Sequence, residues 1–170
     1  MPTLVLTVVG DDRAGLVAAV ADVVDAHGGN WERSQLAELA GTFAGVIEVS
    51  VAADRETALR EALASIDGLL TVAVAAKEQA ADASPSRALS FTVLGNDRSG
   101  IVRDIAAALS AHGVSIDRLT TETRDAAMAG GRLFEATVIA RAPASVDLAA
   151  VTDQLERLAS EIQVDVTVGE

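Results

Sequence analysis

Gly10-Asp11-Asp12-Arg13-Ala14-Gly15-Leu16-Val17 is the segment that decides how this chain is organised, because it occurs twice. It returns as Gly95-Asn96-Asp97-Arg98-Ser99-Gly100-Ile101-Val102; we call residues 10–17 loop 1 and residues 95–102 loop 2. Each loop follows an apolar run typical of a buried strand and precedes apolar residues at helical spacing. An ungapped alignment of residues 4–33 with residues 89–118 has 13 identities in 30 positions. The chain is therefore a duplicated unit with one such loop per copy.

The first copy is expected to contain six elements in the order βαββαβ. Gly28 just past the first helix is typical of a helix C-cap, and Asp54 is a suitable N-cap for the second. Gly41 marks the turn of a hairpin. We predict strands at residues 4–9, 30–39, 43–52 and 69–75, and helices at residues 14–27 and 54–66. The residues expected to face inward from these helices are Leu16, Val17, Val20, Val23, Val24, Ala58, Leu59, Ala62, Leu63 and Ile66.

The second copy repeats this order after a short polar segment, residues 78–87, which contains Pro85 and is predicted to be a linker. We predict strands at residues 89–94, 115–123, 132–141 and 164–168, and helices at residues 100–111 and 146–162. Ile101, Val102, Ile105 and Leu109 are expected to face inward. The expected domains are residues 1–77 and 88–170, each an α+β unit of ferredoxin-like type with an antiparallel sheet and its helices on one face.

The composition excludes several classes of function. The net charge is −12, from 13 basic and 25 acidic residues, and no basic block exists to neutralise phosphates. Direct nucleic-acid binding is therefore not expected, and any control of transcription would act through another protein. The chain has no cysteine, which removes disulfides and thiolate chemistry. Residues 1–9 resemble neither a signal peptide nor a membrane span, so a cytoplasmic protein without membrane association is expected.

The two loops have the chemistry of a site for a small zwitterion. The free N–H groups and positive dipole end of a helix N-terminus favour a carboxylate. Gly15 and Gly100 lack a Cβ and let a ligand approach the backbone. Asp12 and Asp97 place a carboxylate nearby for an ammonium group. Asn30 should also lie near loop 1 if the first two strands are close in space, and its copy in the second unit is Ser115.

A purely structural interpretation of the same residues stays open. An aspartate before a helix is often an N-cap, and Arg13 and Arg98 are able to form ordinary surface ion pairs. His27 and His112 are interpreted as partners of helix ends rather than as metal ligands or bases. The sequence has no nucleophile elbow, Walker loop or metal-ligand spacing. An enzyme is therefore not expected, and neither is a metal or another cofactor.

At these residues the sequence resembles tandem ACT-domain proteins, and among them it is similar to the family of glycine-cleavage-system transcriptional repressors. The resemblance rests on two βαββαβ units with a Gly-x-Asp-Arg-x-Gly-(Ile/Leu)-Val loop in each. It implies a homodimeric regulator that senses a small amino acid, glycine or serine favoured, between ACT units and signals to a partner protein. The implied ligand-binding residues are Asp12, Arg13, Ala14, Gly15, Leu16 and Asn30 at the first site, and Asn96, Asp97, Arg98, Ser99, Gly100, Ile101 and Ser115 at the second.

Two further hypotheses stand beside this one. The chain could be a ligand-independent dimerisation or interaction module, in which each loop is only a capped turn. It could also be an accessory regulatory subunit of a metabolic enzyme. The difference between Asn30 and Ser115 favours the first site over the second.

Overall fold

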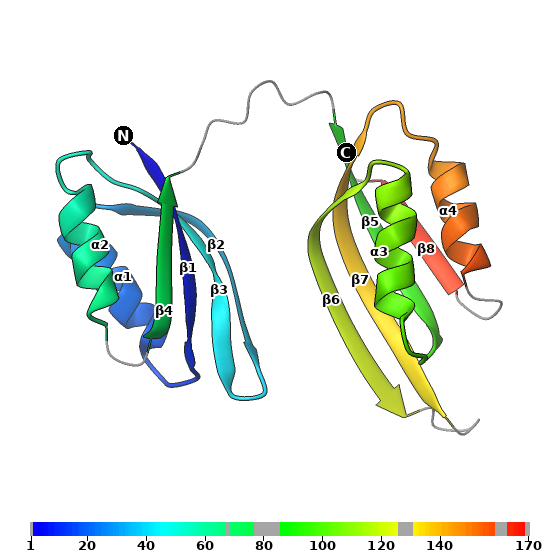
Figure 1. Ribbon diagram of the computed structural model, residues 1–170, viewed down its shortest axis with the longest axis horizontal. Helices are drawn as coiled ribbons and strands as arrows, with labels where there is room; N and C mark the ends of the chain where they lie inside the picture. The colour runs from blue at the N-terminus through cyan, green and yellow to red at the C-terminus, as the bar shows by residue number, and fades with distance from the viewer. Residues whose placement is uncertain (1, 67–68, 77–85, 126–130, 159–162, 169–170) are drawn as a thin grey trace. The chain divides into compact units, whose positions relative to one another are not determined.

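The computed structural model describes residues 2–66, 69–76, 86–125, 131–158 and 163–168, which form two compact units, residues 1–80 and 81–170. Both units have the predicted order βαββαβ (Figure 1). The first contains β1 (Thr3–Asp11), α1 (Leu16–Ala26), β2 (Asn30–Leu39), β3 (Thr42–Ser50), α2 (Glu56–Ala64) and β4 (Leu69–Ala76). The second contains β5 (Ser86–Asn96), α3 (Ile101–Ala111), β6 (Ser115–Asp125), β7 (Arg132–Pro143), α4 (Leu148–Arg157) and β8 (Gln163–Val168).

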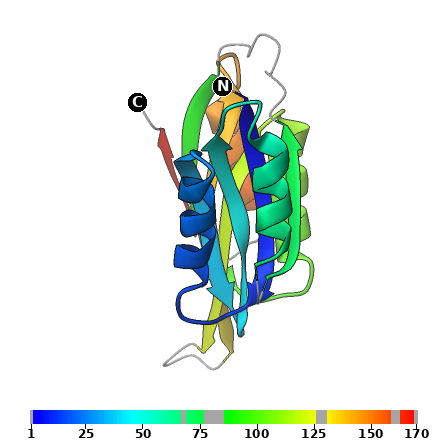
Figure 2. The same ribbon diagram turned by 90° about the vertical axis from the view of Figure 1, so that its left-hand side faces the viewer.

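Each unit is one four-stranded antiparallel sheet with two helices on one face. The strand orders are β2-β3-β1-β4 and β6-β7-β5-β8, so β2 lies at an edge of the first sheet and β6 at an edge of the second. Figure 2 shows α1 and α2 side by side over one face of the first sheet. The predicted fold class, two ferredoxin-like α+β units, is confirmed.

Alternation along the central strands explains why only one sheet face is covered. Leu4, Leu6 and Val8 are buried, whereas Thr7 between them is exposed. Side chains of a strand point alternately to opposite faces, so the three apolar residues meet the helices and Thr7 meets solvent. The core of the first unit consists of Leu4, Leu6, Val8, Val20, Val24, Ile47, Val49, Val51, Leu59 and Leu63. In the second unit, Phe91, Leu109, Val138, Val151 and Leu155 are among the equivalent core residues.

The end of α1 matches the predicted C-cap. Gly28 has a φ of 66°, in the left-handed region that glycine adopts without strain, and its N–H donates to the Asp25 carbonyl over 2.8 Å. His27 Nδ1 lies 2.8 Å from the Val23 carbonyl oxygen, one turn earlier. His112 occupies the same position after α3, but its Nε2 lies 2.6 Å from Gln154 Oε1 of α4. Both histidines therefore have structural partners at a helix end.

Several local predictions are wrong. The N-cap of α2 is Arg55 rather than Asp54, and it makes no capping side-chain bond. Val17, Ala58 and Val102 were expected to face the core but are exposed, because each helix is buried only along the stripe that packs against its sheet.

The predicted linker differs from the structure at its end. Ser86 and Arg87 belong to β5, because Ser86 and Arg87 pair with Pro143 and Ala142 of β7. Residues 78–85 of that segment lie outside the described residues, as do most of the predicted hairpin loop at 125–131 and the end of the helix predicted to reach 162.

Candidate functional site: the two β–α loops

The backbone of both loops depends on glycine at one position. Gly15 is the N-cap of α1 with φ 86°, and Gly100 is the N-cap of α3 with φ 83°. Side chains disfavour this left-handed conformation, and glycine adopts it without cost. Open space surrounds the position of a Cβ at Gly15, whereas a Cβ at Gly100 would lie 3.1 Å from Arg103 Nη2. The glycines are therefore required by the turn itself.

Asp12 and Asp97 are not helix caps, which corrects the structural interpretation of these carboxylates. Each lies three residues before the N-cap glycine. Their backbone N–H groups instead tie the loops to the neighbouring hairpins: Asp12 N donates to the Gly41 carbonyl over 2.9 Å, and Asp97 N to the Arg132 carbonyl over 2.8 Å. Both side chains are left on the surface beside the helix N-terminus.

The other predicted loop residues divide into exposed and buried ones. Arg13, Ala14, Asn96 and Ser99 are exposed. Leu16 and Ile101 are buried in the two cores, so their side chains anchor the first helical turn and only their backbone lies at the loop. The N–H groups of a first helical turn have no acceptor within the helix. The N–H groups of Leu16 and Ile101 donate over 3.4 Å to the carbonyls of Arg13 and Arg98 in their own loops. Each loop thus brings together a carboxylate, a glycine turn and the N-terminus of a helix.

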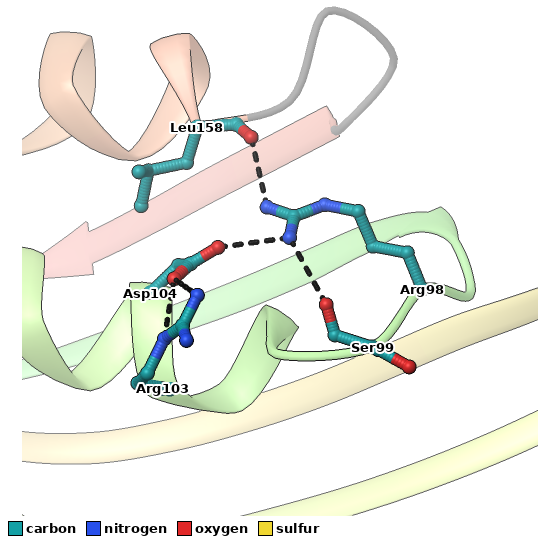
Figure 3. Close-up of polar contacts among 5 residues, drawn as sticks. All are labelled: Arg98, Ser99, Arg103, Asp104 and Leu158. Carbon is teal, nitrogen blue, oxygen red and sulfur yellow. Dashed lines mark hydrogen bonds and ion pairs between the residues drawn. The ribbon is translucent and has the colours of Figure 1, made fainter.

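In loop 2 the charged side chains pair with residues outside the loop, as Figure 3 shows for Arg98. Arg98 Nη1 lies 2.8 Å from Asp104 Oδ2 in the first turn of α3, and its Nη2 donates to the Leu158 carbonyl at the end of α4 over 3.0 Å. Arg103 also reaches Asp104, with Nη2 2.9 Å from Oδ1. Arg132 Nε lies 3.9 Å from Asp97 Oδ2. The structural prediction of an ion pair is therefore confirmed for Arg98.

Loop 1 lacks the residues that make these pairs. The repeat alignment places Ala19 where the second unit has Asp104, and Ala18 where it has Arg103. The matching hydrogen bonds of Asp12 and Asp97 place Gly41 where the second unit has Arg132. The first turn of α1 contains no acidic residue, whereas that of α3 contains Asp104. The sequence-based prediction of the site did not include Asp104 or Arg132. A position-by-position comparison of the two repeats indicates Asp104, because it replaces an alanine.

Asn30 does not lie near loop 1 within its own domain, which corrects the sequence-based expectation. Asn30 pairs with Ser50, and Ser50 pairs with Thr3 at the start of β1. Loop 1 begins at Gly10, at the other end of that strand. Eight residues of strand separate the two levels, or about 26 Å at 3.3 Å per residue. Ser115 has the same relation to loop 2, because it pairs with Arg141 and the loop begins at Gly95.

The start of the hairpin also differs between the domains. Asn30 Nδ2 donates to Glu32 Oε1 over 3.0 Å, and Ser50 Oγ donates to the same oxygen over 2.6 Å. The hydrogen bonds from Ser50 and Asn30 hold the pKa of Glu32 below its ordinary value. In the second unit Asp117 pairs instead with Arg141, whose pKa it raises. At this place the first unit therefore has the hydrogen bonds of Asn30 and Ser50 to a carboxylate, whereas the second unit has an ion pair.

In the part of the chain that the structure describes, no group of three or more His, Asp or Glu side chains is arranged to hold a metal ion. No helix among the described residues is long and apolar enough to cross a membrane.

Comparison with known proteins agrees with this architecture. The ACT domain family matches residues 2–75. The chain is 26% identical to the glycine cleavage system transcriptional repressor of Escherichia coli (strain K12) over 161 residues, which cover 94% of this chain and 85% of that protein. The crystal structure of an unknown protein from Galdieria sulphuraria is similar with a TM-score of 0.84 and 29% identity, covering 99% of both chains. A second structure, provisionally assigned to a glycine cleavage system transcriptional repressor, has a TM-score of 0.70 at 18% identity over 99% of this chain and 98% of that one, and supports the fold.

The first unit matches the ACT domain family, and the second repeats its strand order and its loop. The architecture is therefore that of two ACT-type units in tandem. Over most of its length the chain also resembles the glycine cleavage system transcriptional repressor, as its sequence predicted.

Proposed function

We propose that this protein senses a small amino acid at loop 1 and passes the result to a partner protein. The observation that carries the proposal is loop 1 itself, in which the exposed Asp12 stands three residues before Gly15, the N-cap of α1, and no side chain caps that helix. The amides of a helix N-terminus bind a carboxylate, and a carboxylate binds an ammonium group. A ligand with both groups a few ångströms apart is an amino acid. Gly15 leaves open space at the turn.

The relatives support a role in regulation rather than catalysis. The curated relative is named for transcriptional repression of the glycine cleavage system. We therefore favour glycine or serine as the ligand and a cytoplasmic role in glycine and serine metabolism. The net charge of −12 disfavours direct contact with DNA, so the signal would pass through a protein.

A homodimer would reconcile the position of Asn30 with the proposed site. The strand order leaves β2 at an edge, where its backbone groups are available to a second strand. Antiparallel pairing of two β2 strands would bring the Asn30 end of one copy beside the Leu39 end of the other, which is the end where loop 1 lies. The proposed site then combines Asp12 through Leu16 of one ACT unit with Asn30 of another.

Edge pairing without a ligand is the second candidate function. Leu39 at the hairpin end of β2 is 80% exposed, which suits a contact surface. This module would associate through β2 whatever ligand is added, whereas a sensor changes its assembly or its stability with ligand.

Thermal unfolding against the twenty amino acids tests the proposal. A ligand at 100 times its dissociation constant should stabilise the native protein by about 2.7 kcal/mol, because it binds the folded state alone. Asp12→Ala should abolish this stabilisation, because it removes the partner of the ammonium group. Asp22→Ala, at an exposed position on α1, is the matched control and should retain it. A chain that no amino acid stabilises at millimolar concentration would be the ligand-independent module.

A further inference from the structure

We propose that Glu38 is a positioning residue for the ligand site at loop 1, on which it acts through the turn between β2 and β3. Glu38 holds Gly41, and Gly41 holds Asp12, the carboxylate assigned to the ammonium group of the ligand. The inference rests on the proposed function for its ligand, whereas the contacts themselves belong to the ligand-free protein. Glu38 lies outside loop 1 and outside the repeated motif.

The first step is the place of the turn in the sheet. Thr42 of β3 lies opposite Leu39 of β2 on one side and opposite Asp11 of β1 on the other. The β2–β3 turn therefore lies at the end of the sheet where loop 1 begins, as Figure 1 shows. Glu38 lies opposite Phe43, which packs against the core. Opposite residues of paired strands share a face, so Glu38 is on the face of the sheet that the helices cover.

The second step is the conformation of the turn. Leu39 pairs with Thr42, so Ala40 and Gly41 form a two-residue turn, with φ angles of 52° and 81°. Positive φ at both positions is typical of the type I′ turns that join neighbouring strands. Alanine disfavours this left-handed region, because its Cβ comes close to the following carbonyl oxygen. The turn is therefore strained at Ala40, and a hydrogen bond to Gly41 helps to hold it.

The third step is the series of hydrogen bonds from Glu38 to Asp12. The Gly41 N–H donates to Glu38 Oε1 over 2.7 Å, and the Gly41 carbonyl accepts from the Asp12 N–H over 2.9 Å. Open space surrounds the Cβ position of Gly41, so packing contributes little to holding this residue. If Gly41 moves, the acceptor of the Asp12 N–H moves with it. The place of the Asp12 carboxylate therefore depends on the side chain of Glu38.

The second unit has the same linkage, built from different groups. Thr123 is equivalent to Glu38, since each lies opposite the phenylalanine that pairs with the first glycine of its loop. The Arg132 side chain donates to Thr123 Oγ1, and the Arg132 carbonyl accepts from the Asp97 N–H over 2.8 Å. In both units a side-chain hydrogen bond thus ties this strand position to the residue whose carbonyl holds the loop aspartate. The repetition with different chemistry supports a role in holding that aspartate.

Amide exchange with water, measured by NMR on the ligand-free full chain, tests the linkage. Glu38→Ala should make the amides of Gly41 and, through it, Asp12 exchange about threefold faster, the size expected for loss of one exposed hydrogen bond. Glu38→Gln loses the charge but retains an oxygen acceptor, so both amides should exchange as in wild type. Glu61→Ala, at an exposed position on α2, is the matched control and should also leave them unchanged. Unchanged exchange at Asp12 in a folded Glu38→Ala protein would overturn the positioning of Asp12.

Calorimetry with glycine and with serine tests the effect on the ligand site. Glu38→Ala should weaken binding about fivefold, because the partner of the ammonium group is no longer held in place. Glu38→Gln and Glu61→Ala should bind as tightly as wild type. Full affinity in Glu38→Ala, or equal weakening in Glu38→Gln, would overturn the inference while leaving the proposed function intact. Absence of binding in wild type would overturn the proposed function, and the exchange experiment would still decide whether Glu38 positions Asp12.

Discussion

At the scale of single residues, the two loops share one motif but differ in the residues that surround it. Gly15 and Gly100 have the same left-handed conformation, and Asp12 and Asp97 make the same backbone bond to a hairpin. The difference comes from residues outside the motif. Asp104 and Arg132, at the positions of Ala19 and Gly41 in the first unit, are the partners of Arg98 and Asp97 in the second.

The pair between Arg98 and Asp104 should make stability depend on pH. Arg98, and then Arg103, lower the pKa of Asp104 in the folded state. A carboxyl with a lowered native pKa contributes stability above its unfolded pKa of about 3.9, and this contribution disappears as the pH falls through the lowered value. Urea unfolding of wild type between pH 5 and 2 should therefore show a steeper loss of stability than unfolding of Asp104→Asn.

Arg98→Lys separates charge from geometry in the same titration. It keeps a cation near Asp104 but loses the fork to Leu158, so its pH profile should lie between those of wild type and Asp104→Asn. Identical acid profiles for all three proteins would contradict the contribution assigned to this pair.

At the scale of elements, the hairpins of the two domains differ in the sizes of two residues that lie opposite each other. Leu36 lies opposite Gly45 in the first unit, and Thr121 lies opposite Ala136 in the second. Leu36 packs against the core, and Ala136 is itself buried. The first unit thus has a large side chain, Leu36, opposite glycine, and the second has a smaller one, Thr121, opposite alanine. In each pair one residue contacts the core.

Gly45→Ala should therefore be costly. A Cβ at this position would lie 2.1 Å from the Gln35 carbonyl oxygen and 2.8 Å from Leu36 Cα, both of them backbone atoms of β2. The strand would have to move, and overpacking of this kind costs about 1–3 kcal/mol of unfolding free energy. Thermal or urea unfolding measures it, with Ala37→Gly on the exposed neighbouring strand as a comparison. A Gly45→Ala protein as stable as wild type would show that β2 shifts freely.

The order and type of the elements were predictable because they depend on local patterns. The continuous apolar run of β1 and the helical spacing in α1 are properties of neighbouring residues, and both elements form where the sequence predicts them, although only one face of β1 is fully buried. The position of Asn30 was not predictable in the same way. It depends on the register of β2 against β3 and of β3 against β1, which joins residues far apart in the chain.

The same limit applies to the candidate site. The motif indicated the right loops, because strand, turn and helix are consecutive there. The partners of Arg98 and Asp97 come from α4 and β7, some 60 and 35 residues away, so their pairing follows from tertiary structure. Asp12 also shows that an aspartate before a helix is an unsafe sign of a cap when a glycine in the left-handed region follows it.

At the scale of the whole molecule, the duplication gives the chain two copies of one loop with different residues around them. The second domain carries ion pairs at loop 2 and at Asp117–Arg141, where the first has Ala19, Gly41 and Ser50. We assign ligand binding to loop 1 of the first domain. A ligand affects a partner only through a difference in affinity between two states.

The central claim is that an amino acid binds at loop 1. An amide-resolved NMR titration of the full chain with glycine and with serine tests it most directly, because it reports where binding occurs as well as whether it occurs. The account predicts saturable shift changes concentrated at the amides of Gly15, Leu16, Val17 and Ala18, with those of Gly100 to Arg103 unchanged. Changes centred on loop 2, or no saturable change at either loop, would contradict it.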